Sequence, residues 1–412
     1  MNKICITGGK LFNGKDTTIF ENPQVIIEGN KIVGVNKEEN QQPVGEDYKK
    51  ITLNADHFIF PGLIDSHVHV QSSGQPNFED DFKDSVALMG IRAGVNATKT
   101  LMAGFTTIRD ASAESLIDIS VKKAIEKGYI KGPRMLVSCR GLSITGGHGD
   151  HANGWPPEVS FAQRYVVDGP LEVRKAVREQ LRDGADVIKV AATGGILSTG
   201  DNPDHIGLRV DEMREAVEEA QNAGKKVMAH AQGAVGIKNA IIAGVHSIEH
   251  GSILTDEIIE MMIEKGVFLV PTLVAGYLIS EKGSEAGIPE NSVKKAKQIV
   301  DLGFENFKKA YKAGVKIAMG TDAGTCFNFH GNNAKELELM VNSGMSPFDA
   351  LQAATIKGAE LLDLSETLGS IEAGKLADIV IVEGNPIENI KIFQDKELMP
   401  FIIKDGELIK GK

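Results

Sequence analysis

The middle of the chain repeats one unit, a polar helix that ends in glycine followed by a short apolar strand, and this repeat limits the fold more than any other feature. Glycine just past a helix end is the usual left-handed cap. These glycines are Gly104, Gly132, Gly184, Gly224, Gly244, Gly266 and Gly314. The strands that we expect are Ile59 to His69, Phe105 to Ile108, Arg134 to Cys139, Asp186 to Ala191, Lys226 to Ala231, His246 to His250, Val267 to Thr272 and Val315 to Met319.

Eight strands alternating with helices predict an α/β protein built as a parallel (β/α)8 TIM barrel. An open, doubly wound sheet is the structural alternative. Such a sheet usually has fewer strands, and no Gly-x-Gly-x-x-Gly turn follows the first strand here. We expect the long segment from Ile279 to Tyr311 to carry an inserted helix after the seventh strand, because Lys294 to Lys312 has a helical pattern with a charged outer face.

Both ends of the chain alternate short β-like runs with turns. Hairpins are predicted around Gly29-Asn30 and around Asp405-Gly406, because such pairs between apolar runs favour tight turns. Each end alone is too short to bury a core. We therefore predict that residues 1–59 and 365–412 together form one small β-sandwich domain, and that residues 60–364 form the barrel.

The composition excludes several classes of function. The chain has 412 residues, 42% of them hydrophobic, and a net charge of −11 without a basic block, which disfavours nucleic-acid binding. The three cysteines are widely spaced, so neither a disulfide framework nor a Cys-x-x-Cys zinc site fits, and a reducing cytoplasm is the simple interpretation. We expect no signal peptide and no membrane-spanning segment, because no apolar stretch is long enough.

The first predicted barrel strand ends in a pair of histidines. His67 and His69 stand two positions apart, and side chains at i and i+2 of a strand point to the same face. Two imidazoles on one face can bind one metal ion. Taken alone, such a pair is more often a structural feature than a metal site.

Four further residues fall at the same ends of later strands. Lys189 ends the fourth strand, His230 the fifth and His250 the sixth, and Asp322 follows the eighth. Each has an ordinary alternative, as a hydrogen-bonded core histidine, a turn or helix cap, or a salt-bridged or Schiff-base lysine. Functional groups of a barrel gather at the C-terminal strand ends, and burying six unpaired polar groups there would cost several kcal/mol. A metal centre removes this problem.

Lys189 suggests a site with two metal ions. An ammonium group has no lone pair to donate, but burial and nearby positive charge favour the neutral amine, which can add carbon dioxide to become a carbamate. Such a carbamate could bridge two ions about 3.5–4 Å apart. We therefore hypothesise that His67, His69 and Asp322 hold one ion and His230 and His250 hold the other. The N-carboxylated Lys189 and a hydroxide would bridge them.

The six residues resemble the dinuclear branch of the amidohydrolase superfamily, and the likeness covers essentially the whole chain. The run Gly369 to Val380 is similar to that superfamily's return into its small β domain. The runs Thr193-Gly194-Gly195, Ile248-Glu249-His250-Gly251 and Gly320-Thr321-Asp322-Ala323-Gly324 resemble the metal-dependent Xaa-Pro dipeptidases, a group related to imidazolonepropionase that includes carboxypeptidases. Imidazolonepropionase lacks the strand-four lysine, so Lys189 argues against that activity.

The resemblance implies a mechanism. The ions would lower the pKa of a bound water toward ~7, and the resulting hydroxide would attack an amide carbonyl polarised by the ion on His230 and His250. Asp322 would take the hydroxide proton and return it to the leaving amine. Zinc is the default for histidine-rich sites, and manganese or cobalt are alternatives.

The loops after the strands are expected to select the substrate. His148 and Arg140, in the loop after the third strand, could hold a substrate carboxylate, although a structural loop with solvated charges explains them equally well. His151, His205, Tyr277 and His330 have no role that the sequence identifies.

Three functions remain. The first is a dinuclear zinc peptidase or amidase that acts on small-molecule dipeptides or N-acyl amino acids. The second is a hydrolase of a cyclic amide, a lactone or a heterocycle, as in imidazolonepropionase or a deaminase. The third is a catalytically silent scaffold, which need not keep all six proposed ligands. We also expect a homo-oligomer, although no residue pattern identifies its interface.

Overall fold

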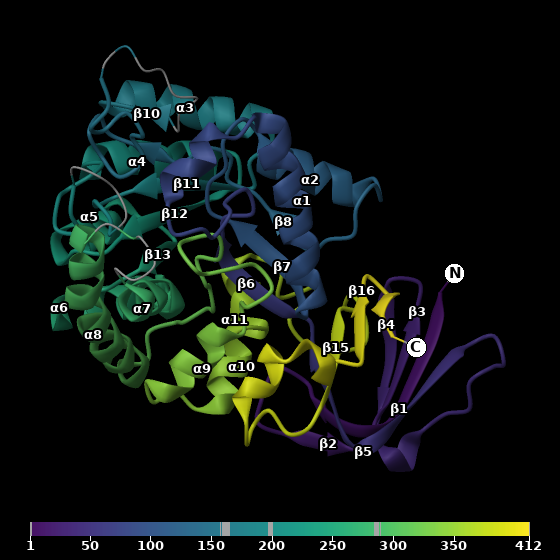
Figure 1. The fold of residues 1–412 in the computed structure, drawn as a ribbon. Helices are drawn as coiled ribbons and strands as arrows, with labels where there is room; N and C mark the ends of the chain where they lie inside the picture. Colours follow the sequence, from purple (N-terminus) through teal and green to yellow (C-terminus); the bar gives the residue numbers. More distant parts are fainter. Residues whose placement is uncertain are drawn as a thin grey trace.

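The computed structural model describes residues 2–156, 158, 165–196, 201–283, 288 and 290–411. Figure 1 shows a ring of helices around a set of strands, with a separate group of strands from both chain ends beside it. Part of the predicted insertion, residues 284–287 and 289, lies outside the described residues. No helix among the described residues combines the length and apolar character needed to cross a bilayer.

Strands from both ends of the chain pair in one sheet. Its order is β17-β16-β15-β5-β1-β3-β4, with β2 paired to β1. The strands are β1 Lys3–Phe12, β2 Ile19–Glu21, β3 Gln24–Glu28, β4 Lys31–Asn36, β5 Lys49–Pro61, β15 Ile379–Glu383, β16 Phe401–Lys404 and β17 Glu407–Lys410.

The pairing within this terminal sheet confirms both predicted hairpins. Glu28 pairs with Lys31 across the first turn, and Lys404 pairs with Glu407 across the second. One apolar cluster joins the two ends, because Ile27, Ile59 and Ile379 are all fully buried in it. The described strands pair as a single sheet, so the two-layered sandwich expected from the sequence stays a prediction.

The middle of the chain forms two parallel sheets. One has the order β6-β7-β8 and the other β10-β9-β11-β12-β13-β14. The strands are β6 Leu63–Val68, β7 Phe105–Asp110, β8 Arg134–Leu136, β9 Leu142–Ser143, β10 Tyr165–Val166, β11 Val187–Ala191, β12 Lys226–Ala231, β13 Ser247–His250 and β14 Phe268–Val270. Seven of the predicted strands are therefore present, and the short β9 and β10 were not foreseen.

The eighth predicted strand is not among the described strands. Residues 315–319 have no ladder, and Ile317 makes only a single parallel bridge with Leu269. Hydrogen bonds nevertheless connect this segment to both neighbours, from Leu269 N to Lys316 O (2.8 Å) and from Ser66 N to Met319 O (2.9 Å). The segment therefore lies between β14 and β6, where the sequence places the eighth strand.

Helices follow most of the strands and cover their outer faces. They are α1 Val86–Met102, α2 Ile117–Glu126, α3 Pro170–Asp183, α4 Val210–Asn222, α5 Ala234–Ala243, α6 Asp256–Lys265, α7 Leu273–Lys282, α8 Glu290–Ala313, α9 Lys335–Asn342, α10 Pro347–Ala353 and α11 Ile356–Leu361. Short 3-10 turns are η1 Glu38–Asn40, η2 Phe78–Lys83, η4 Ile390–Gln394 and η5 Lys396–Leu398. The helix predicted over Lys294 to Lys312 is confirmed as α8.

Glycine caps separate these helices from the next strands. Gly184, Gly244 and Gly266 are left-handed caps of α3, α5 and α6, as predicted. At α2 the prediction of Gly132 is wrong: the helix ends earlier, and Gly128 has the positive φ of 71°.

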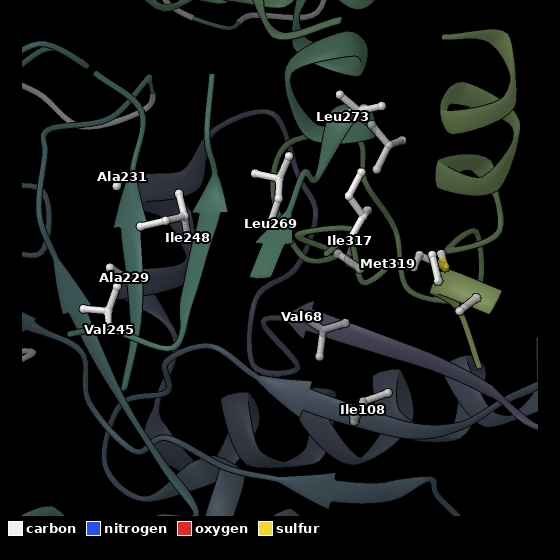
Figure 2. Packing of buried hydrophobic residues seen from close by; sticks show 14 of the residues in the cluster. Val68, Ile108, Ala229, Ala231, Val245, Ile248, Leu269, Leu273, Ile317 and Met319 are labelled. Carbon is white, nitrogen blue, oxygen red and sulfur yellow. The ribbon is translucent and has the colours of Figure 1, made fainter. Parts of the chain in front are cut away.

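The strands pack through apolar side chains such as Ile108, seen in Figure 2.

Candidate metal centre

The C-terminal strand ends bring the six predicted metal ligands to one cavity. Its volume is about 460 Å³, and its lining includes His67, His69, Lys189, His230, His250 and Asp322. These residues come from β6, β11, β12, β13 and the segment after residue 319. The parallel register explains the convergence, because Ala191 pairs with His230 and Ala231 pairs with His250.

Asp322 lies against His67 of β6 and against His69, which directly follows that strand. Its Oδ1 is 3.4 Å from Nε2 of His67 and 3.1 Å from Nε2 of His69. Burial raises the pKa of the Asp322 carboxyl, but the interactions with His67 and His69 outweigh burial and hold the pKa well below its usual range. Asp322 is therefore a carboxylate, the form that binds cations.

In both His67 and His69 the other ring nitrogen, Nδ1, already has a hydrogen-bond partner. Nδ1 of His69 lies 3.2 Å from the carbonyl oxygen of Ser112, which can only accept a hydrogen bond. Burial lowers the pKa of His69, which favours the neutral ring. Nε2 of His67 is buried without a hydrogen-bond partner.

The second pair of histidines is held in the same way. Nε2 of His230 lies 2.9 Å from Gly194 O, which leaves its Nδ1 as the acceptor. Nδ1 of His250 lies 2.7 Å from Oγ1 of Thr272. The ring centroids of His230 and His250 are 4.6 Å apart. Burial, followed by the charge of Lys189, lowers the pKa of His230 to about 3, so this ring is neutral and able to bind a cation.

A left-handed backbone conformation orients the side chains of two candidate ligands. His250 has a φ of 73° and Asp322 a φ of 61°, conformations that side chains other than glycine rarely adopt. On a regular strand, Glu249 and His250 would point to opposite faces. Because the left-handed turn interrupts this alternation, the His250 ring lines the cavity while Glu249 still reaches His67.

Lys189 lies in the same cavity as the candidate histidines. It is only 7% exposed, on β11. After burial and other charged neighbours, its positive charge contributes to holding the pKa of His250 well below the usual value. The charge of Lys189 therefore lowers the pKa values of His230 and His250, as expected for a group within the site.

These side chains fit a metal site. One ligand atom each from His67, His250 and Asp322 lies within 4.8 Å of the others, and only donor types suited to zinc or a similar ion are involved. The residues present therefore suit the divalent ions that the sequence predicts.

A buried ion pair behind His67 was missed by sequence reasoning. Glu249 is fully buried, and its Oε2 lies 2.7 Å from Nδ1 of His67, while Arg109 donates to both carboxylate oxygens. The sequence does contain a signal for this pair. Arg109 and Glu249 are each a charged residue within an apolar strand, and buried charges are rarely unpaired. Asp65 is another such residue, and it accepts from the backbone N of His67 at 3.1 Å.

The two predicted substrate-binding residues differ in location. His148 lines the cavity, and its ring stacks on His230 with centroids 3.9 Å apart. Arg140 is not part of the described cavity lining. Its Nε lies 3.8 Å from Glu114 Oε2, and its guanidinium lies over the ring of Tyr165. The structure thus places His148, but not Arg140, beside the candidate ligands.

Four other residues were left without a role by the sequence. His151 lines the cavity and lies 3.6 Å from Glu114 Oε1. His205 is exposed beside Asn202, and Tyr277 lies under Lys335, 5.5 Å from its ammonium group. His330 is buried, with Nε2 located 3.1 Å from the carbonyl oxygen of His69.

Comparisons with known proteins agree with this geometry. The sequence pattern of the amidohydrolase family matches residues 58–409. Ochratoxinase from Aspergillus niger is 35% identical over 373 residues, which is 86% of this chain and 76% of that protein. Imidazolonepropionase from Fusobacterium nucleatum subsp. nucleatum is 23% identical over 425 residues, covering 96% of this chain and 93% of that protein.

The chain is also similar to solved structures. A Xaa-Pro dipeptidase with methionine bound in its active site has a TM-score of 0.93 and 38% identity, over 100% of both chains. The resemblance seen in the sequence is confirmed, and the fold is of the TIM-barrel type. The chain belongs to the amidohydrolase family and is a hydrolase that acts on amide bonds.

Proposed function

We propose that the protein is a dinuclear metal-dependent hydrolase that cleaves dipeptides or N-acyl amino acids. His67, His69 and Asp322 would hold one divalent ion, and His230 and His250 the other. Lys189, carboxylated by carbon dioxide, would bind both, and zinc is the expected metal.

One observation carries this proposal. Nε2 of His69 and Oδ1 of Asp322 lie 3.1 Å apart, and one ligand atom each from His67, His250 and Asp322 lies within 4.8 Å of the others. The buried Nε2 of His67 points to the same oxygen without a hydrogen-bond partner. Two imidazole nitrogens and a carboxylate oxygen converge here, and a divalent cation is a partner that all three can bind.

Asp322 is the proposed acid–base group. Bound ions would supply Lewis acidity, lowering the pKa of a water toward ~7 and polarising the scissile carbonyl. The Asp322 carboxylate, held ionised between His67 and His69, would take a proton from the attacking water at Oδ1 or Oδ2. It would then return that proton to the leaving nitrogen.

The substrate would occupy the 460 Å³ cavity. His148 is the favoured group for a substrate carboxylate, because it lines the cavity and stacks on His230. Arg140 would assist only after leaving Glu114, which lies 3.8 Å from its Nε. The likeness to a Xaa-Pro dipeptidase supports a dipeptide substrate.

The proposed architecture follows the sequence analysis. Residues 60–364 would form a closed eight-stranded barrel, supported by the hydrogen bonds that residues 316 and 319 make to β14 and β6. Residues 1–59 and 365–412 would form a small β-sandwich domain. A cytoplasmic location and a homo-oligomeric state remain part of the proposal.

The test is a metal and substrate assay of the purified protein. Protein stripped by a chelator should be inactive, and zinc should restore hydrolysis of dipeptides or N-acyl amino acids at about two ions per chain. His69→Asn should lose both metal and activity, whereas His57→Asn, in the terminal sheet, should lose neither. Full activity of the metal-free protein, or hydrolysis only of cyclic amides, would exclude the proposal.

A further inference from the structure

An ion pair lies inside the barrel strands, directly behind one of the candidate ligands. Glu249 of β13 is 0% exposed and Arg109 of β7 is 2% exposed. Removing two charges from water is costly, and a buried ion pair is often no more stabilising than apolar side chains of the same size. A stability role alone is therefore a weak explanation for this pair.

The carboxylate of Glu249 makes contacts on both of its oxygens. Oε1 accepts from Nη2 of Arg109 at 2.8 Å and also from Ser247 Oγ. Oε2 accepts from the same Nη2 at 3.0 Å and lies 2.7 Å from Nδ1 of His67. Because an ionised carboxylate can only accept, the proton between Glu249 and His67 belongs to Nδ1.

Arg109 also restrains the backbone of the same histidine. Its Nε donates to the carbonyl oxygen of Ser66, the residue before His67, at 2.6 Å. Glu249 thus fixes the ring of His67 while Arg109 fixes the strand that carries it. Two independent restraints converge on a single ligand, which a general structural ion pair would not require.

We propose that Glu249, held in place by Arg109, is a positioning residue that sets the ring orientation and tautomer of His67, so that its Nε2 lone pair points at Asp322. This inference rests on the proposed function, since it gives His67 the role of a metal ligand. A carboxylate behind a histidine also makes the ring a stronger donor to a metal ion. Glu249 itself touches neither substrate nor ion and acts only through His67.

The test compares zinc affinity by chelator competition. Glu249→Gln keeps the size of the side chain but removes its charge, and should weaken zinc binding about 10–100-fold. Asp118→Asn is the matched control, because Asp118 is also a buried carboxylate, and its oxygens accept from the backbone N–H groups of Ile119 and Cys139. The control should keep its zinc affinity within about twofold.

A second variant separates positioning from folding. Glu249→Gln leaves the Arg109 guanidinium unpaired, which can destabilise the chain. The double variant Glu249→Gln with Arg109→Gln removes both charges and also the contact of Arg109 with Ser66, and should lose at least as much zinc affinity. The cobalt(II)-loaded variants should also differ in visible absorption from the unsubstituted protein, because the donor strength of one ligand changes.

A readout on the unsubstituted protein does not depend on any Glu249 variant folding. Zinc-loaded protein with ¹⁵N-labelled histidine should show the His67 ring protonated at Nδ1 and ligated at Nε2. Ligation through Nδ1 would overturn the inference, as would wild-type zinc affinity in either variant. If the unsubstituted protein takes up no divalent metal, the proposed function itself fails. If it binds metal and hydrolyses amides but the variants are unaffected, only the role of Glu249 is lost.

Discussion

Asp322 occupies the centre of the site, because its Oδ1 contacts the rings of both His67 and His69. Its pKa is held well below the usual range by these contacts, in spite of burial. The residue therefore remains ionised at neutral pH in the metal-free protein. An ionised carboxylate can both bind a cation and accept a proton, which is the combination that the proposed mechanism requires.

Replacing Asp322 by asparagine separates these two abilities. The amide oxygen can still contact a metal ion, but it cannot take up and return a proton. We expect Asp322→Asn to keep much of its metal while turnover falls about 10²–10⁴-fold. Metal analysis and initial rates measure both quantities, with Asp301→Asn on the exposed face of α8 as the control. Unchanged turnover would exclude Asp322 as the acid–base group.

Lys189 tests the bridge between the two proposed ions. Lys189→Ala removes the side chain that is proposed to bind both, so we expect activity to be lost and bound metal to fall by about half. Elemental analysis of the purified variant measures the metal, and Lys294→Ala, an exposed position of α8, is the control. A fully active Lys189→Ala protein would contradict the dinuclear arrangement.

His330 makes the metal-free protein sensitive to acid. Burial lowers the pKa of His330 to about 4, whereas an unfolded histidine titrates near ~6.5. Between these values only the unfolded chain binds the proton, so stability falls as the pH is lowered from about 6.5 to about 4.

The variant His330→Gln should make this decline shallower, by at most about 1.4 kcal/mol per pH unit. Urea unfolding of metal-free protein between pH 4 and pH 7 measures the slope. His205→Gln, at an exposed position, should leave the slope as it is. An equally steep decline in the His330 variant would mean that other groups take up the protons.

The candidate ligands could be foreseen from the sequence because they stand near the ends of apolar runs, and all but His67 and His69 follow a helix with glycine just past its end. Glu249 could not, because strand alternation places it opposite His250. Only the left-handed backbone of His250 lets the side chains of both residues approach His67. Arg140 stays a prediction, and its contact with Glu114 depends on loop packing that no local pattern specifies.

Among the elements, the segment at the position of the predicted eighth strand leaves no room for a side chain at Gly320. A Cβ on Gly320 would lie 2.4 Å from Cγ1 of Val270 and 2.9 Å from Cβ of His67. Glycine is therefore needed here for space, between β14 and β6. The sequence indicated an eighth strand from its apolar pattern, but the absence of a regular ladder depends on these tertiary contacts.

Gly320→Ala should push the segment away from His67. We expect a loss of about 1–3 kcal/mol in the free energy of unfolding together with weaker metal binding. Gly90→Ala in α1 is the control, since a Cβ there meets no atom within 4 Å, and it should be neutral or slightly stabilising. Chemical denaturation and chelator competition measure the two effects, and an unaltered metal affinity would show that His67 tolerates the shift.

On the scale of the whole molecule, Arg134 connects the parallel strands to the terminal sheet. From β8 it donates to Asp378 at 2.7 Å and also contacts Asp405. The Asp378 side chain is 4% exposed, so it would be left buried and without this partner if Arg134 were replaced. Such a loss is much more costly than the loss of a surface ion pair.

We expect Arg134→Met to lower the free energy of unfolding by about 3 kcal/mol, and Asp378→Asn in the same chain to recover part of it. Lys131→Met is the matched control, because Lys131 also reaches the terminal sheet, at Glu407, but both side chains are more than half exposed. Its effect should stay below about 1 kcal/mol. Equal losses in the two variants would mean that burial of Asp378 is unimportant.

The pairing of β5 with both β1 and β15 has a consequence for synthesis. Residues 49–61 are synthesised long before residues 379–383. The edge of β5 that pairs with β15 therefore stays unpaired during most of translation. The strand that carries His67 follows directly after β5. A truncated messenger RNA that lacks the codons for β15, β16 and β17 should therefore yield no active hydrolase. β15, which pairs with the strand directly before the one that carries His67, is among the last strands to be synthesised.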